Sequence, residues 1–443
     1  MQRSLTQGPI TRNMLLFALP LMLSGILQLM FNAVDIIVVG HFSSSQALAA
    51  VGSTTALINV FVNLFIGVSL GTNVLAARCY AAGKDKEMSE VVHTSILFAL
   101  ISGIVMAVIG VLLAKPALQL MQTPADVIDQ SALYMRIYFL GMPFFMLYNY
   151  GAAVLRAVGD TKRPLMYLIL SGIVNTLLNL FLVIVFRLAV AGVAISTIIA
   201  QCISCILILN CLRKSESSYK LTFSGLSIKW VYLRQIFQVG IPAGIQSTVI
   251  NFSNALLQSS VNSFGSTAMA GYTAANNILG FLYASVNAVT QACMSFTSQN
   301  FGVGKYKRVD LVLRDCMILT VGVSLVLGGG AYLFGNEVLR IYTNDSEVVR
   351  CGVEILSITT VPYFLCGIMD LFPGSLRGMG YSTVPMILSV VGTVGMRIFW
   401  IYRVFPFHRS LYVLFISYPA SWTFTIIMQV ICFICVRKIV NRR

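Results

Sequence analysis

Charged side chains are scarce in this chain of 443 residues: 10% are Asp, Glu, Lys or Arg, whereas 57% are hydrophobic. Soluble globular domains carry about 25% charged residues. The chain therefore has too little polar surface to coat the two or three soluble domains that its length would allow. The composition excludes such domains and indicates a protein that is solvated mainly by lipid.

Long polar segments are lacking as well. A helix needs ~20 consecutive apolar residues to cross a bilayer, and stretches of that kind recur along the chain with short polar breaks. A β-barrel would need short alternating segments, and lipid leaves the backbone only the helix or the closed barrel. The sequence predicts an all-α membrane protein with twelve transmembrane helices, at 13–40, 47–77, 89–114, 127–155, 165–186, 189–212, 235–262, 267–299, 316–334, 351–376, 383–402 and 410–436.

Acidic residues are few, and 15 of them against 30 Lys and Arg give a net charge of +15. If the amino terminus and every second loop share one side, that side holds twenty-two Lys and Arg and the other side six. This is the positive-inside distribution. It explains the basicity by topology, so we expect no nucleic-acid partner. We expect a multi-pass protein of the plasma (cytoplasmic) membrane, with both termini cytoplasmic and membrane lipid as its surroundings.

Motifs of catalysis and nucleotide binding are absent. The chain has no HExxH and no Gly-rich loop followed by Lys-Ser or Lys-Thr. Its ten cysteines lie mostly within predicted spans, and the close pair Cys432 and Cys435 has no His nearby. We interpret all ten as small apolar packing residues. The sequence therefore predicts no enzyme activity, no bound cofactor and no transport driven by ATP on this chain.

The chain contains an internal repeat. At an offset of about 221 residues, LRAVGDTKRPLM from Leu155 aligns with LRGMGYSTVPMI from Leu376, and Gly83-Lys84 aligns with Gly304-Lys305. Ordered matches at one offset predict two related halves of six helices. Because six crossings return each half to the same side, the halves should be parallel repeats.

The domain organisation follows from this repeat. We predict an N-lobe of helices 1–6 at 1–214, a basic cytoplasmic linker at 215–232 and a C-lobe of helices 7–12 at 233–443. The interface between two pseudo-symmetric six-helix bundles is the natural pathway for a solute. We expect the chain to act as a monomer.

Asp35 and Asp370 are the two clearest intramembrane carboxylates in the predicted spans. A charge at membrane depth costs at least ~2.5 kcal/mol, so such an acid is a candidate for function. Asp35 ends a polar row on one face of the first helix, in which the other members are Ser24, Gln28 and Asn32. We interpret this row as a polar stripe that faces the interior of the protein.

Other intramembrane polar residues extend this set. Asn175 and Asn179 are one turn apart on the fifth helix, where their oxygens would complete a coordination shell begun by a carboxylate. Asn149 and Asp370 both precede the arginine of a repeated Leu-Arg by seven residues. Polar residues of the seventh helix form an analogous row. The row comprises Ser247, Asn251, Asn254 and Gln258.

Each of these residues has a second interpretation. Intramembrane amides also join helices by hydrogen bonds of roughly 0.6 kcal/mol. Asp370 can reach water or pair with Arg377. Arg397, in the eleventh span, either lines the cavity or neutralises a carboxylate, or else extends to the interface. The sequence leaves these alternatives open.

Several segments resemble the MATE family, the multidrug and toxic compound extrusion transporters. They are FNAVDIIVVGHF from Phe31, ALAAVG from Ala47, NVLAARCYAAGK from Asn73 and LRAVGDTKRP from Leu155. The likeness covers the whole chain in length, number of spans and two-lobed repeat. It implies a V-shaped pair of six-helix bundles that opens alternately to each side and exports cationic amphiphiles against entry of Na+ or H+.

The resemblance also assigns residues. Asp35 matches the ion-binding acid of the amino lobe, and Asn175 matches its partner on the fifth helix. Many members have an Asp four residues after that Asn, where this chain has Asn179. Sodium-coupled members often carry a Glu on the seventh helix, where this chain reads Ile250 and Asn251, and Asp370 lies about one turn nearer the Leu-Arg than their acid.

The resulting hypothesis is an antiporter in which H+ or Na+ and a cationic solute compete for one carboxylate. The ion-coupling residues would be Asp35, Asn32, Asn175, Asn179 and, secondarily, Asp370, with Na+ at Asp35 and Asn175 in a sodium-coupled mechanism. Solute would contact a second set, comprising Gln28, Asn149, Asn251, Asn254, Gln258 and Arg397.

Two rival functions are considered. A lipid-linked oligosaccharide flippase of similar architecture would need several basic residues to hold a pyrophosphate, and only Arg397 and Arg136 lie within spans. A channel or receptor would also have inward polar stripes, but the two-lobed repeat favours alternating access.

Overall fold

The computed structural model describes residues 5–121 and 123–441, and these form helices and no strand. In the first half, the helices are α1 (Ile10–Phe42), α2 (Ser45–Ala81), α3 (Asp85–Leu120), α4 (Ile128–Leu140), α5 (Met142–Ala157), α6 (Lys162–Leu180), the π-helix η1 (Phe181–Val185), α7 (Ala189–Arg213) and the short η2 (Phe223–Gly225).

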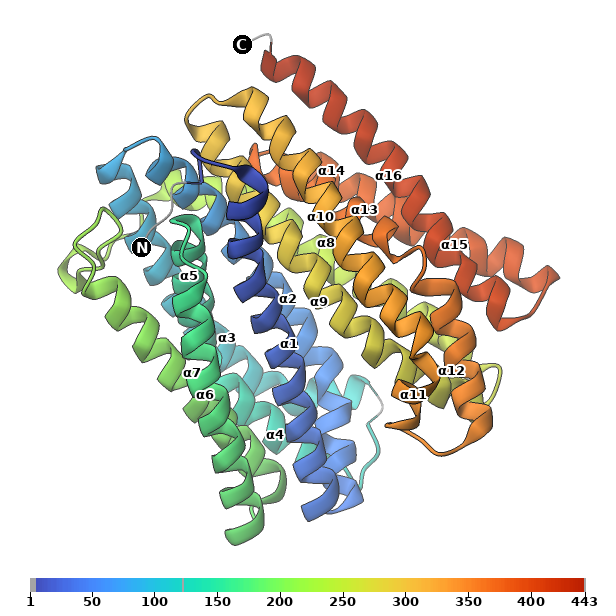
Figure 1. Ribbon diagram of the computed structural model, residues 1–443. Coiled ribbons are helices and arrows are strands. Elements are labelled where there is room, and N and C mark those ends of the chain that lie inside the picture. The colour runs from blue at the N-terminus through green and yellow to red at the C-terminus, as the bar shows by residue number, and fades with distance from the viewer. Residues whose placement is uncertain (1–4, 122, 442–443) are drawn as a thin grey trace. The chain divides into compact units, whose positions relative to one another are not determined.

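The second half of the chain is coloured from yellow-green to red in Figure 1. Its helices are α8 (Trp230–Asn262), α9 (Ser266–Gly302), α10 (Tyr306–Leu333), α11 (Gly335–Arg340), α12 (Ser346–Thr359), α13 (Tyr363–Gly378), α14 (Thr383–Ser389), η3 (Val390–Gly395), α15 (Met396–Phe399), η4 (Trp400–Val404), η5 (Phe405–Phe407) and α16 (Leu411–Asn441).

The predicted spans coincide with these helices. Among the described residues, nine helices are long and apolar enough to cross a membrane, and two bent pairs, α4 with α5 and α12 with α13, supply two more. The remaining predicted span, 235–262, corresponds to α8. This helix has 33 residues but is not among those nine. Its row of Ser, Asn and Gln side chains makes it more polar than its neighbours.

The chain divides into two compact units. The first comprises Ile26–Ile241, and the second comprises Leu5–Gly25 together with the residues from Pro242 onward. Within the first unit α6 packs along α7 and α3 along α4 and α5; within the second, α9 packs against α13, α10 and α12. The predicted lobes, 1–214 and 233–443, were drawn at loops, whereas the units are divided within α1 and within α8.

Close helix contacts explain why α1 and α8 are each shared. The first half of α8 crosses α2 in the first unit, where a Cβ on Gly71 would lie 2.1 Å from the Ile236 carbonyl oxygen and one on Gly240 2.5 Å from the Val68 Cα. Likewise, the first half of α1 lies against α9 in the second unit, where a Cβ on Gly25 would be 3.1 Å from the Ala284 Cβ. Small residues allow these helices to approach.

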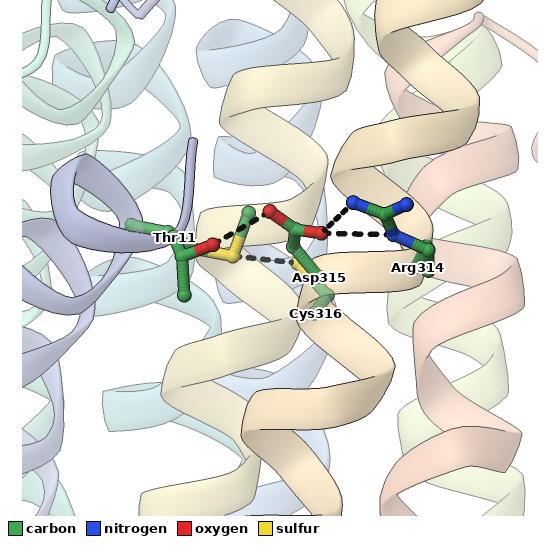
Figure 2. Close-up of polar contacts among 5 residues, drawn as sticks. Thr11, Arg314, Asp315 and Cys316 are labelled. Carbon is green, nitrogen blue, oxygen red and sulfur yellow. Dashed lines mark hydrogen bonds and ion pairs between the residues drawn. The ribbon is translucent and has the colours of Figure 1, made fainter. Parts of the chain in front are cut away.

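Polar contacts hold the start of α1 to the second unit (Figure 2). The Thr11 hydroxyl donates to Asp315 Oδ2 at 2.7 Å, and Arg314 bonds the other oxygen of that carboxylate at 3.0 Å. Asp315 is buried. In the first unit, Thr94 of α3 accepts from the Lys229 backbone N–H and donates to the Ser227 carbonyl just before α8.

The two contacts are equivalent in the repeat, since Thr94 and Asp315 are separated by the 221-residue offset. The same position of the third helix in each half, in α3 and in α10, therefore bonds the chain near the start of a helix that the two units share, α8 or α1.

Candidate functional site

Asp35 lies in a cluster of buried hydrogen-bonding side chains in the first unit. Asn175 Nδ2 donates to Asp35 Oδ1 at 2.9 Å, and Asn179 Nδ2 donates to the same oxygen. Asn179 Oδ1 in turn accepts from the Ser196 hydroxyl of α7. Asn175, Asn179 and Ser196 are buried, whereas Asp35 is half-buried. The structure thus joins α1, α6 and α7 through the predicted carboxylate and both predicted amides.

The position of Asp35 depends on a glycine one helical turn before Asn175. Gly172 faces the Phe31 ring so closely that a Cβ there would lie 2.0 Å from two ring carbons. Phe31 and Asp35 share one face of α1, and Gly172, Asn175 and Asn179 share one face of α6, because residues three or four apart align along a helix. The absent side chain lets the two faces meet.

The hydrogen bonds leave this site with unused oxygen acceptors. Asn175 Oδ1 is buried and has no hydrogen-bond partner. Asp35 makes no ion pair among the described residues. A carboxylate with an adjacent free amide oxygen is the donor set that a hard cation prefers, and protonation of Asp35 would neutralise the same charge.

Sequence reasoning missed three neighbours of this carboxylate. Ser196 completes the hydrogen-bonded chain, and the charge of Asp35 also acts on the hydroxyls of Tyr134 and Tyr138 in α4. A single Ser or Tyr in an apolar helix is not a signal by itself. The spacing of Tyr134 and Tyr138, one turn apart, was the available hint.

The remaining polar residues of α1 and α5 are not part of this cluster. Gln28 and Asn32 have exposed side chains and make no hydrogen bond to another described residue. Asn149 donates to the Phe145 carbonyl of its own helix at 2.8 Å. The structure therefore does not bring Asn32 into the group that holds Asp35, and the solute-binding roles predicted for Gln28 and Asn149 stay predictions.

The second unit contains Asp370 at the middle of α13. This half-buried carboxylate makes no hydrogen bond or ion pair with a described residue, and its electrostatic neighbours are Arg377 and Tyr283. Arg377 Nη2 instead donates to Gln246 Oε1 at 2.7 Å. The alternative in which Asp370 pairs directly with Arg377 is wrong for this structure.

Arg397 is another buried charged group of the second unit. Its side chain is buried, its Nη1 donates to Asn254 Oδ1 at 2.7 Å, and its guanidinium lies 4.4 Å from the centre of the Tyr418 ring. It does not extend to an interface. Asn251 and Gln258, which were predicted beside Asn254 in the same row, have exposed side chains.

A family model matches two segments of this chain. The model described as MatE matches residues 20–181 and again 242–402. The two segments begin 222 residues apart and cover most of the chain, which confirms the internal repeat.

Curated relatives match over nearly the whole chain. A probable multidrug resistance protein of Bacillus subtilis, YoeA, is 28% identical over 430 residues, which are 95% of this chain and 92% of the relative. A second B. subtilis protein, YpnP, is 29% identical over 91% of this chain and 88% of its own length. The multidrug export protein MepA of Staphylococcus aureus is 23% identical over 87% and 85%.

Solved structures confirm the fold. A crystal structure of MATE in complex with MaL6 superposes with a TM-score of 0.93 at 19% identity, covering 99% of both chains. The outward-facing conformation of a multidrug resistance MATE family transporter gives 0.92 at 18% identity, over 99% of this chain and 98% of the other. The predicted all-α architecture of twelve helices in two bundles is therefore correct.

Proposed function

The chain belongs to the MatE family, and from that premise we propose that it exports cationic or amphiphilic solutes by antiport with H+ or Na+ through alternating access. Its curated relatives are named for multidrug resistance or multidrug export. The observation that carries the proposal is the hydrogen-bonded carboxylate of Asp35, with the free Asn175 oxygen beside it.

Asp35 is the group for which ion and solute compete. An isolated carboxylate inside a membrane protein is costly, and a proton, a Na+ ion or a cationic solute each stabilises it. Since one site cannot hold two cations, entry of the ion displaces the solute and binding of the solute displaces the ion. Asn175 and Asn179 hold the carboxylate in place, and for Na+ the Asn175 oxygen supplies a further ligand.

The available driving force depends on stoichiometry. Exchange of one monovalent ion for one monovalent solute moves no net charge, so the ion gradient supplies ~1.4 kcal/mol per tenfold ratio. A second ion would add ~2.3 kcal/mol per 100 mV of membrane potential. We place the transporter in the cytoplasmic membrane as a monomer surrounded by lipid, with both termini cytoplasmic and no further cofactor.

Efflux of ethidium, a monovalent aromatic cation, from proteoliposomes tests this proposal. An imposed pH or Na+ jump should drive ethidium movement by the wild type. Asp35→Asn removes the charge and keeps the shape, so we expect its ion-driven rate to fall by at least tenfold, because a neutral amide binds neither H+ nor Na+ comparably.

Asp370→Asn is the control, since Asp370 is a half-buried acid of the second unit and makes no hydrogen bond with a described residue. It should reduce the rate less than Asp35→Asn does. Full ion-driven efflux by Asp35→Asn would refute the proposal.

A further inference from the structure

The guanidinium of Arg397 donates hydrogen bonds from one edge and packs with one face against an aromatic ring. The side chain is 3% exposed, and Nη1 donates to Asn254 Oδ1 at 2.7 Å and to Ser253 Oγ at 3.5 Å. The Tyr418 ring lies 4.4 Å from the guanidinium carbon, at which distance a cation–π contact stabilises and orients the cation. These three partners are neutral, so they position the charge without cancelling it.

The opposite edge of the guanidinium has no hydrogen-bond partner among the described residues. Nε is buried and has no hydrogen-bond partner, and Nη2 makes no hydrogen bond to a described residue. Nε and Nη2 point their hydrogens in parallel, which is the fork that binds both oxygens of a carboxylate or phosphate. The unused donors of Arg397 thus have the geometry of an oxyanion site.

The described part of the chain supplies no counter-ion for this fork. No Asp or Glu there forms an ion pair with Arg397. Asp370 and Arg397 both act electrostatically on the Cys366 thiol, but no ion pair joins these two side chains. A buried, unpaired cation is strongly unfavourable, so an external anion would relieve a cost that the fold sustains.

The repeat shows that this charge is specific to the second half. With the 222-residue offset that joins Pro20 to Pro242, Asn254 corresponds to Asn32. With the 221-residue offset that joins Pro164 to Pro385, Arg397 corresponds to Thr176, the neighbour of Asn175 on the fifth helix. In both units a fifth-helix residue, Asn175 or Arg397, contacts the helix that is shared between units, α1 or α8. One repeat thus presents a carboxylate to that contact, and the other presents an arginine.

We propose that Arg397 is a subsite for a carboxylate carried by the transported solute, with Asn254 and Tyr418 as positioning residues. This rests on the proposed function and extends its substrate class from simple cations to acidic or zwitterionic amphiphiles. A lipid phosphate offers the same oxyanion chemistry, so the test separates the two sources.

Rhodamine B and its ethyl ester are a suitable pair of probes, because they share the cationic ring system and only the former has a free carboxylate. Fluorescence anisotropy of each dye with purified protein in detergent gives both affinities without an ion gradient. The wild type should bind rhodamine B about 10–100-fold more tightly than the ester, which is the range for a hydrogen-bonded charge pair. Arg397→Met should abolish that preference and leave ester binding unchanged.

Two further variants separate a fork from a general charge effect. Arg397→Lys keeps the charge but loses the parallel donors, so it should recover only part of the preference. Arg136→Met removes an exposed arginine of α4 and should change neither affinity.

A wild type without preference for rhodamine B, or an equal loss for both dyes in Arg397→Met, would overturn the subsite. Displacement of rhodamine B by phosphatidylglycerol in mixed micelles but not by benzoate would overturn its assignment to solute. Failure of ion-driven ethidium efflux with this preference intact would refute the proposed antiport alone.

Discussion

Gly172 sets the distance between the carboxylate on α1 and the amides on α6. The Phe31 ring occupies the space where a side chain at position 172 would begin. Phe31 is one turn before Asp35, so a displaced ring also disturbs the backbone that carries the carboxylate. Packing at a residue with no charge therefore supports the proposed ion site.

Gly172→Ala should lower the free energy of unfolding by about 1–3 kcal/mol, which is typical of overpacking. The clash is with Phe31, so the same substitution in a Phe31→Ala background should cost much less. Gly322→Ala on the exposed face of α10, where a Cβ meets nothing within 4 Å, is the control and should be nearly neutral. Thermal unfolding of the purified variants checks this, and equal costs for Gly172→Ala in both backgrounds would contradict the packing argument.

At the residue scale, the sequence predicted the carboxylate and amide side chains of the two sites better than the hydroxyl and aromatic side chains that contact them. Asp35, Asn175 and Asn179 were identifiable because such side chains are costly in lipid. Ser196 and Tyr418 were not, since hydroxyl and aromatic residues are frequent in membrane helices for packing reasons. Asn32 was included because of its helical face, but that face extends past the cluster, and its side chain is exposed.

At the scale of the element, the shared helices α1 and α8 depend on polar contacts at their starts. Thr11 bonds the buried carboxylate of Asp315, and Thr94 bonds the backbone before α8. These hydrogen bonds fix the position of the first turn of α1 and of the residues just before α8. The approximate bounds of the long helices could be predicted because a helix that crosses lipid needs a long apolar run. Short helices such as α11 have no such run and were not predicted.

Thr11→Val keeps the shape of the side chain and removes its hydroxyl, leaving Asp315 Oδ2 without its 2.7 Å hydrogen bond. We expect a loss of about 1–2 kcal/mol in unfolding free energy. Thr423→Val is matched, because that exposed hydroxyl bonds only the Pro419 carbonyl of its own helix. Chemical unfolding of both variants measures the difference, and identical stabilities would show that the contact in Figure 2 does not stabilise α1.

At the scale of the whole molecule, the two repeats carry opposite charges at the corresponding contact between their first and fifth helices, with Asp35 on α1 and Arg397 on α15. The sequence predicted the repeat, because short motifs recur in order at one offset. It did not predict that each unit includes half of a helix from the other repeat, since loop positions say nothing about which helices pack together. The distribution of charge is also what the two proposals use: an acid for the cation and an arginine for an anion.

Competition at Asp35 is the central claim, and equilibrium binding of ethidium to the purified protein measures it most directly. Lowering the pH or adding Na+ should weaken ethidium binding by the wild type, because the ion occupies the carboxylate that the dye requires. In Asp35→Asn, the affinity should be lower and independent of both ions. Ethidium binding that responds to neither ion in the wild type, or that keeps the same response in Asp35→Asn, would contradict the account.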